Sequence, residues 1–150
     1  MIDLSPPSTP TPGGGAPTGI LLSRDLIFTS KITGTAKLLG HQVLVAGGEG
    51  LALAMIARWR PRAVFVDLGA GDLVRPEALI AYRAAAAEAG PEVGGATAFV
   101  AFGSHVDLDG MAAAKAAGCD PVLPRSRFTS ELPELIRRHL GEASGVGPAA

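Results

Sequence analysis

Five short apolar segments recur along the chain, and each is followed by a longer segment with helical periodicity. The apolar segments span 19–23, 42–46, 63–67, 97–101 and 121–123. They are apolar at consecutive positions, which is typical of strands covered by helices on both faces. The intervening segments predict helices over about 26–39, 50–59, 76–89, 107–117 and 130–140. This alternation predicts one α/β domain built on a parallel sheet.

The two ends of the chain differ in composition from the segment between them. Five prolines and the run Gly13–Gly15 lie within residues 1–18. Proline removes backbone donors and glycine adds chain entropy, so this stretch predicts a disordered leader. A proline-rich ligand for another protein is the alternative to a simple tether. We therefore expect a leader over 1–18, a domain over 19–140 and a flexible tail over 141–150.

Composition narrows the class of protein. A chain of 150 residues with 47% hydrophobic residues is the size of one domain and can build a core. Its 13 Lys and Arg balance 14 Asp and Glu, which excludes binding to nucleic acid by simple electrostatic attraction. A single cysteine excludes a disulfide framework and a cysteine-based zinc site.

The mean hydropathy of +0.31 raises the question of a membrane segment. No predicted helix is long and apolar enough to span a bilayer. The first four residues contain Asp3 and no basic residue, and no apolar signal-peptide core follows them. We therefore expect a cytoplasmic protein that does not bind membranes.

Helix-capping patterns support the predicted boundaries. Pro76 fits the first turn of the helix over 76–89. Ser104 and Asp107 are spaced like a capping box, and this spacing predicts the start of the fourth helix. Gly118 suits the end of the same helix.

Polar residues follow the predicted strands where each strand ends. Parallel strands bring their carboxyl ends to one edge of the sheet, where ligands usually bind. The side chains expected there are those of Ser23, Arg24, Asp25, Asp67, Ser104 and Arg125, with Gly103 beside them. One cleft is therefore expected to hold acids, a hydroxyl group and a base.

Two segments carry a resemblance to a known family. Residues 63–67 end in an aspartate after an apolar strand, and 116–125 reads Ala-Ala-Gly-Cys-Asp-Pro-Val-Leu-Pro-Arg. Both resemble the receiver (CheY-like) domain of two-component response regulators. The resemblance covers about 19–140. It implies a flavodoxin-like (βα)5 fold, with a doubly wound, parallel, five-stranded sheet of strand order 2-1-3-4-5.

The resemblance assigns roles to several residues. It makes Asp67 the phosphoacceptor, whose carboxylate would attack a phosphohistidine and form an acyl phosphate. In the family an acidic pair after the first strand holds Mg²⁺. Here that pair reads Arg24-Asp25, so one acid of the pair is missing and Asp25 and Asp67 are the metal-ligand candidates for Mg²⁺. Alternatively, Arg24 pairs with Asp67 and supplies the positive charge that Mg²⁺ brings in the family.

Three further positions correspond to groups that contact the phosphoryl group in the family. The lysine of the family corresponds to Arg125, which can bind phosphoryl oxygens as a fork. The family's switch hydroxyl corresponds to Gly103, with Ser104 one position late. The resemblance is therefore better in order and spacing than in signature residues.

We expect a stand-alone receiver-like signalling domain rather than an enzyme. No output domain is expected after Leu140, so its output would be contact with a protein partner, through the fourth helix, fifth strand and fifth helix. That partner would be a sensor kinase in a phosphorelay or an adaptor target. Both a phosphorylated Asp67 and a phosphorylation-independent pseudo-receiver stay open, and Arg24 favours the second.

Two other classes of function compete with signalling. The same cleft would suit a flavodoxin-like domain or enzyme that binds a small molecule. Against it, residues 23–26 contain no glycine, whereas flavin and dinucleotide phosphates need close backbone approach. The third class is a structural partner in a larger complex, with the leader as its tether.

Overall fold

The computed structural model describes residues 17–89 and 96–141. It confirms five parallel strands in the order β2-β1-β3-β4-β5. The strands are β1 (Gly19–Leu22), β2 (Val43–Ala46), β3 (Ala63–Asp67), β4 (Ala98–Gly103) and β5 (Val122–Pro124). The helices are α1 (Leu26–Leu38), α2 (Glu49–Trp59), η1 (Gly71–Val74, a 3-10 turn), α3 (Pro76–Ala89), α4 (Leu108–Ala116), α5 (Arg125–Ser130) and α6 (Leu132–Leu140). Almost all of the predicted leader 1–18 and tail 141–150 lies outside the described residues.

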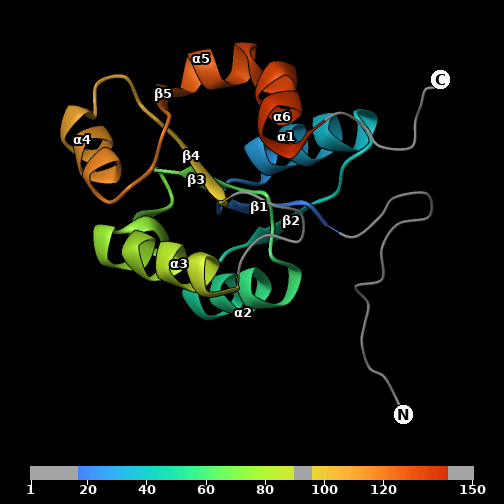
Figure 1. The fold of residues 1–150 in the computed structure, drawn as a ribbon. Coiled ribbons are helices and arrows are strands. Elements are labelled where there is room, and N and C mark those ends of the chain that lie inside the picture. The colour runs from blue at the N-terminus through green and yellow to red at the C-terminus, as the bar shows by residue number, and fades with distance from the viewer. Residues whose placement is uncertain (1–16, 90–95, 142–150) are drawn as a thin grey trace.

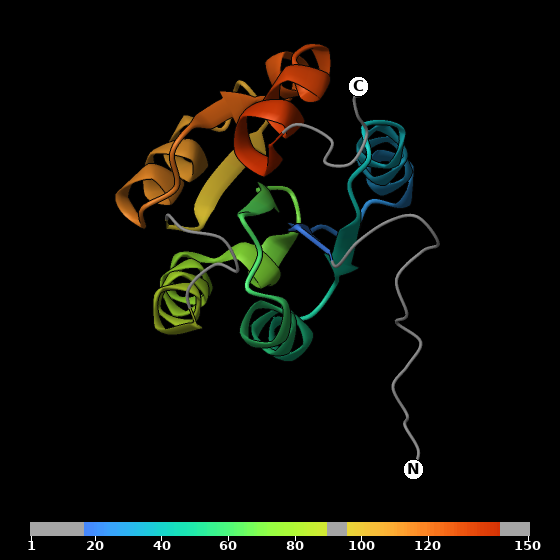
Figure 2. The ribbon, with the colours of Figure 1, turned by 45° about the vertical axis from the view of Figure 1, so that its right-hand side comes forward.

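Helices cover both faces of the sheet (Figures 1 and 2). One buried cluster joins the sheet to α2, η1, α3 and α4, and a second joins it to α1, α5 and α6. Neighbouring strand residues alternate between the clusters: Val64 and Val66 belong to the first, and Phe65 belongs to the second. This explains why the strands are apolar at consecutive positions. Within the described residues, no helix has the length and apolar character needed to cross a membrane.

The fourth helix begins differently from the prediction. Its N-cap is Asp107, whose carboxylate accepts from the Gly110 backbone N–H at 3.0 Å. The Ser104 hydroxyl accepts from Val106 N–H at 3.3 Å and lies outside the helix. The capping-box interpretation of Ser104 is therefore wrong, because the N-cap is Asp107, three residues further along the chain.

The C-terminal helix predicted over 130–140 is observed as α6, and the structure has a short helix before it that was not predicted. A short helix α5 precedes α6, and the break falls at Glu131, whose φ and ψ are −104° and 12°. Pro133 in the first turn of α6 fits a new helix start. The sequence did not reveal α5 because Phe128 is its single large apolar residue, and one residue defines no periodicity.

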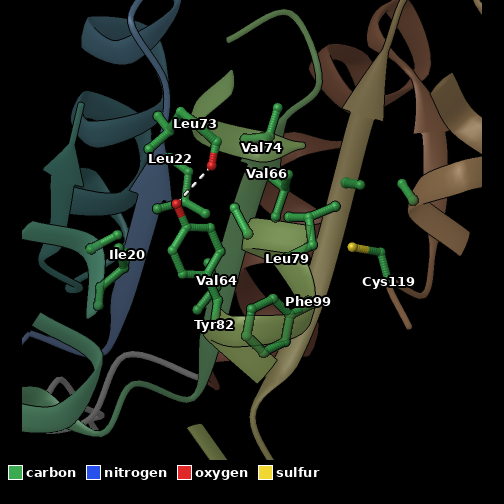
Figure 3. Close-up of a cluster of buried hydrophobic side chains, with 14 of the residues drawn as sticks. Ile20, Leu22, Val64, Val66, Leu73, Val74, Leu79, Tyr82, Phe99 and Cys119 are labelled. Atoms are coloured by element: carbon green, nitrogen blue, oxygen red, sulfur yellow. Dashed lines mark hydrogen bonds between the residues drawn. The ribbon is translucent and has the colours of Figure 1, made fainter. Parts of the chain in front are cut away.

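Tyr82 anchors α3 against the sheet. Its side chain is fully buried, and its hydroxyl donates to the Leu73 carbonyl of η1 at 2.6 Å (Figure 3). Burial, with a smaller effect from the Glu49 charge, raises the pKa of Tyr82 to about 12. The phenol is therefore held in its neutral, donating form.

Tyr82 is the chain's one tyrosine, so an ultraviolet titration reports it alone. We expect its ionisation near pH 12 in the folded protein and near pH 10 in denaturant. Because the unfolded chain loses this proton first, stability should fall as pH rises from about 10 to 12. Equal midpoints in the two states would contradict the buried hydrogen bond.

Candidate functional site

The Asp67 carboxylate lies at the carboxyl end of β3, buried and surrounded by donors. Its Oδ2 accepts from the Ser23 hydroxyl at 2.8 Å. Its Oδ1 accepts from Gly69 N–H at 2.9 Å and from Arg125 Nη2, also at 2.9 Å. The residue is 3% exposed. Both oxygens are thus engaged, and the negative charge is matched by one guanidinium group.

Three loops position these donors. Ser23 directly follows β1, Gly69 follows β3, and Arg125 begins α5 directly after β5. The Arg125 guanidinium also lies over the Phe28 ring, 5.6 Å from its centroid. A side chain at position 69 would crowd this arrangement, since a Cβ there would lie 3.1 Å from Arg125 Nη2. Glycine therefore lets the arginine approach the backbone.

Arg24 does not pair with Asp67, and the alternative ion pair drawn from the sequence is wrong. Its guanidinium donates to the Gly47 carbonyl at 3.0 Å and to the Ala70 carbonyl at 3.2 Å. It also pairs with Asp72 at 3.1 Å, with both side chains substantially exposed. The sequence could not show this, because the ion pair joins loops that follow different strands. Arg24 thus cross-links the loops after β1, β2 and β3.

Asp25 is the N-cap of α1. Its Oδ1 accepts from Phe28 N–H at 3.0 Å, which satisfies a free donor of the first helical turn. Within residues 17–89 and 96–141, no three His, Cys, Asp or Glu side chains gather as ligands for a metal ion. Each of the two metal-ligand candidates, Asp25 and Asp67, instead accepts hydrogen bonds from protein groups.

Gly103 and Ser104 do not bring a side-chain hydroxyl to the carboxylate. Gly103 is the last residue of β4, and a Cβ there would lie 3.1 Å from the Leu68 Cβ. Leu68 thus fills the space that a hydroxyl-bearing side chain at 103 would enter. The Ser104 side chain is exposed and bonded to Val106 N–H.

Sequence reasoning missed Ser23 as a partner of Asp67. Its hydroxyl donates to Asp67 and accepts from Asp25 N–H at 3.2 Å. The residue is 2% exposed, so its hydroxyl needs these partners. Its position directly after β1 indicated that it lies near Asp67, but the roles were assigned to the charged residues that follow it, Arg24 and Asp25.

The strand order and the helices on both faces of the sheet give this chain a receiver-like (CheY-like) fold. Solved structures of receiver domains share it. The receiver domain of NtrX from Brucella abortus has a TM-score of 0.66 and 18% identity, over 81% of this chain and 97% of that one. A CheY-like receiver domain from Methanospirillum hungatei has a TM-score of 0.67 and 16% identity, over 84% and 94%.

A third structure is informative about metal binding in the fold. The receiver domain of a sensor histidine kinase from Pseudomonas aeruginosa has a TM-score of 0.65 and 20% identity, over 85% of this chain and 100% of that one. It holds a magnesium ion in its active site cleft. No protein-family model matches this chain, and no curated protein sequence matches it.

Proposed function

We propose that this chain is a signalling domain that acts through contact with a protein partner and does not depend on phosphorylation of Asp67. The observation that carries the proposal is the closed network around the Asp67 carboxylate. Ser23, Gly69 and Arg125 donate to it at 2.8–2.9 Å. A carboxylate held in this way is less available as a nucleophile, because attack on phosphorus uses an oxygen that these donors hold.

The side chains around Asp67 fit a magnesium ion poorly. Mg²⁺ prefers near-octahedral oxygen ligands and is usually held by carboxylates. Here Asp25 caps α1, and Arg24 brings a positive charge to the loops after β2 and β3, at the Asp67 end of the sheet. We infer that the arginines supply fixed positive charge at this end of the sheet, where magnesium would supply it in a receiver that binds the metal.

The contact surface proposed from the family resemblance is the face formed by α4, β5 and α6, the helix that the sequence predicted over 130–140. Two large aliphatic side chains are exposed where it begins: Val106 is 74% exposed and Leu108 is 71% exposed. Exposed aliphatic residues lower the cost of removing a surface from water on association. Their place beside the Asp67 end of the sheet supports a docking role.

Site-specific photo-crosslinking in the native cell tests this proposal. A crosslinking residue at Leu108 is expected to capture a partner, and the same residue at Leu51 of α2, also exposed, is the matched control. A protein captured from Leu108 and not from Leu51, with equal yield whether or not a phosphodonor is supplied, supports the proposal. No capture, equal capture from both positions, or a yield that depends on the phosphodonor contradicts it.

A flavodoxin-like binding function at the Asp67 end gains no support from the geometry. The Asp67 oxygens are bonded to protein groups, and Leu68 fills the space beside Gly103. A pocket of about 330 Å³ does exist in the domain, but Gln42 and Val43, which line it, stand at the start of β2. Since the strands are parallel, that pocket is at the opposite end of the sheet from Asp67.

A further inference from the structure

The edge strand β2 lacks the features that usually protect the edge of a sheet. Within the part of the chain that the structure describes, β2 pairs with β1 alone, so its outer side faces no partner strand. Its register with β1 continues residue by residue from Val43 to Ala46 without a bulge. The strand contains no charged residue and no proline. Proteins commonly place such residues on edge strands, because an open edge pairs with another chain.

The opposite edge of the sheet is better protected. The strand β5 has three residues, its last residue is Pro124, and Pro121 directly precedes it. Proline has no backbone N–H group and therefore shortens the ladder that an added strand could form. Of the two edges, β2 is the one that can accept a further strand. The groups on its outer side are backbone donors and acceptors, and their complement is an extended peptide.

A strand added at β2 would meet an apolar side chain on the α2 side of the sheet. The helices α1 and α2 cover opposite faces (Figures 1 and 2). Val43 and Val45 pack in the cluster with α1, so Leu44 between them points to the α2 face. Leu44 is half-buried and belongs to neither cluster, whereas every residue of β1 is buried. Leu44 thus leaves apolar surface that an added strand can cover.

The α1 side of the same edge is polar and basic. Lys37, exposed in the last turn of α1, borders one surface depression together with Thr33 and Val43. Residues 26–48 contain two lysines and no acid. Among the described residues, no acid forms an ion pair with Lys37. An acidic side chain on this side of an added strand would therefore meet an uncompensated positive charge.

We propose that the outer edge of β2 binds an extended peptide segment of a protein partner, in which aliphatic and acidic side chains alternate. Side chains of a strand point alternately to the two faces of a sheet. The aliphatic ones lie on the α2 side against Leu44, and the acidic ones lie on the α1 side near Lys37. Backbone hydrogen bonds to β2 hold the segment, and the alternation fixes which face it turns to each helix. This surface is separate from the one proposed at Leu108, and its use does not involve Asp67.

The test is a titration of the isotope-labelled full chain with defined peptides, followed by amide NMR. The probe is a short peptide of alternating valine and glutamate, blocked at both ends. It is expected to cause saturable shifts at residues 43–46, with a dissociation constant of about 1 mM or below. The same peptide N-methylated at every residue has no N–H group to donate, and a peptide of alternating valine and lysine reverses the charge. Each is expected to bind at least about tenfold more weakly.

Two pairs of variants locate the binding. Leu44→Glu brings a negative charge to the edge and should abolish binding of the probe, while Ile80→Glu on α3, also at an exposed position, should leave binding unchanged. Because Leu44 packs in neither cluster, the fold should persist in its variant. Lys37→Glu should weaken binding about tenfold, and Lys31→Glu on the same helix should change it less than about twofold.

The proposal is overturned if the probe gives no saturable shifts up to about 10 mM, or if the N-methylated peptide binds as well as the probe. Shifts at residues 43–46 that follow protein concentration without peptide would identify a second copy of this chain as the occupant, which also overturns it. Shifts centred on Arg125 or on β5 do the same. None of these results uses the crosslinking positions, so the two proposals fail separately.

Discussion

Replacing Phe128 by alanine is expected to lower the free energy of unfolding by about 3–5 kcal/mol. The side chain is fully buried in the cluster between the sheet and α1, α5 and α6. Its ring stacks on Phe102 with centroids 4.1 Å apart, and meets the edge of Phe65 at 6.0 Å. The loss combines removal of a large apolar surface with a cavity that the flanking rings cannot fill.

Urea unfolding followed by circular dichroism measures this effect. Phe128→Leu is the matched control, since it keeps most of the volume and should cost less than about 1.5 kcal/mol. A loss below about 1 kcal/mol for the alanine variant would show that α5 does not pack as described. The prediction also concerns the site, because α5 carries both Phe128 and Arg125.

Replacing Asp67 by alanine is expected to lower the free energy of unfolding by about 2–4 kcal/mol. The change leaves the buried Ser23 hydroxyl and the Gly69 N–H without their acceptor. It also removes the partner of Arg125, although that side chain is 41% exposed and can be rehydrated. The hydroxyl and the amide therefore contribute most of the loss.

Asp67→Asn separates charge from shape, and a double-mutant cycle with Arg125→Ala isolates the ion pair. We expect about 1–2 kcal/mol lost for the asparagine variant and a stabilising coupling of about 1 kcal/mol between the two positions. A gain in the free energy of unfolding for Asp67→Asn would have the opposite meaning. A protein becomes more stable on neutralisation of a carboxylate when other acids surround that carboxylate. An asparagine variant more stable than the parent protein would contradict the role given to Arg125.

The fold was predictable because its evidence is repeated and local. Five apolar segments and the capping residues place every strand within about two residues of its observed bounds, as for 63–67 and β3. The strand order came from the resemblance carried by 63–67 and 116–125, since periodicity does not order strands. The helix α5 was missed because a single turn with one buried residue leaves no pattern.

The site was only partly predictable. The sequence placed Asp67, Arg125 and Arg24 at one edge of the sheet, and the structure puts all three there. Which arginine reaches Asp67 depends on how the loops pack, because Arg24 and Arg125 are 43 and 58 residues from Asp67 in the chain. Ser23 was placed at the same edge, but its bond to Asp67 was not predicted, because a hydroxyl gains its importance from burial and burial is set by the packed fold.

The most direct test of the account is an intact-mass measurement of the protein after incubation with Mg²⁺ and acetyl phosphate. A receiver domain that binds magnesium is treated in parallel, to show that the phosphodonor works. We expect no mass increase in this protein, because Ser23, Gly69 and Arg125 hold the Asp67 carboxylate. A magnesium-dependent gain of one phosphoryl group that disappears in Asp67→Asn would contradict it.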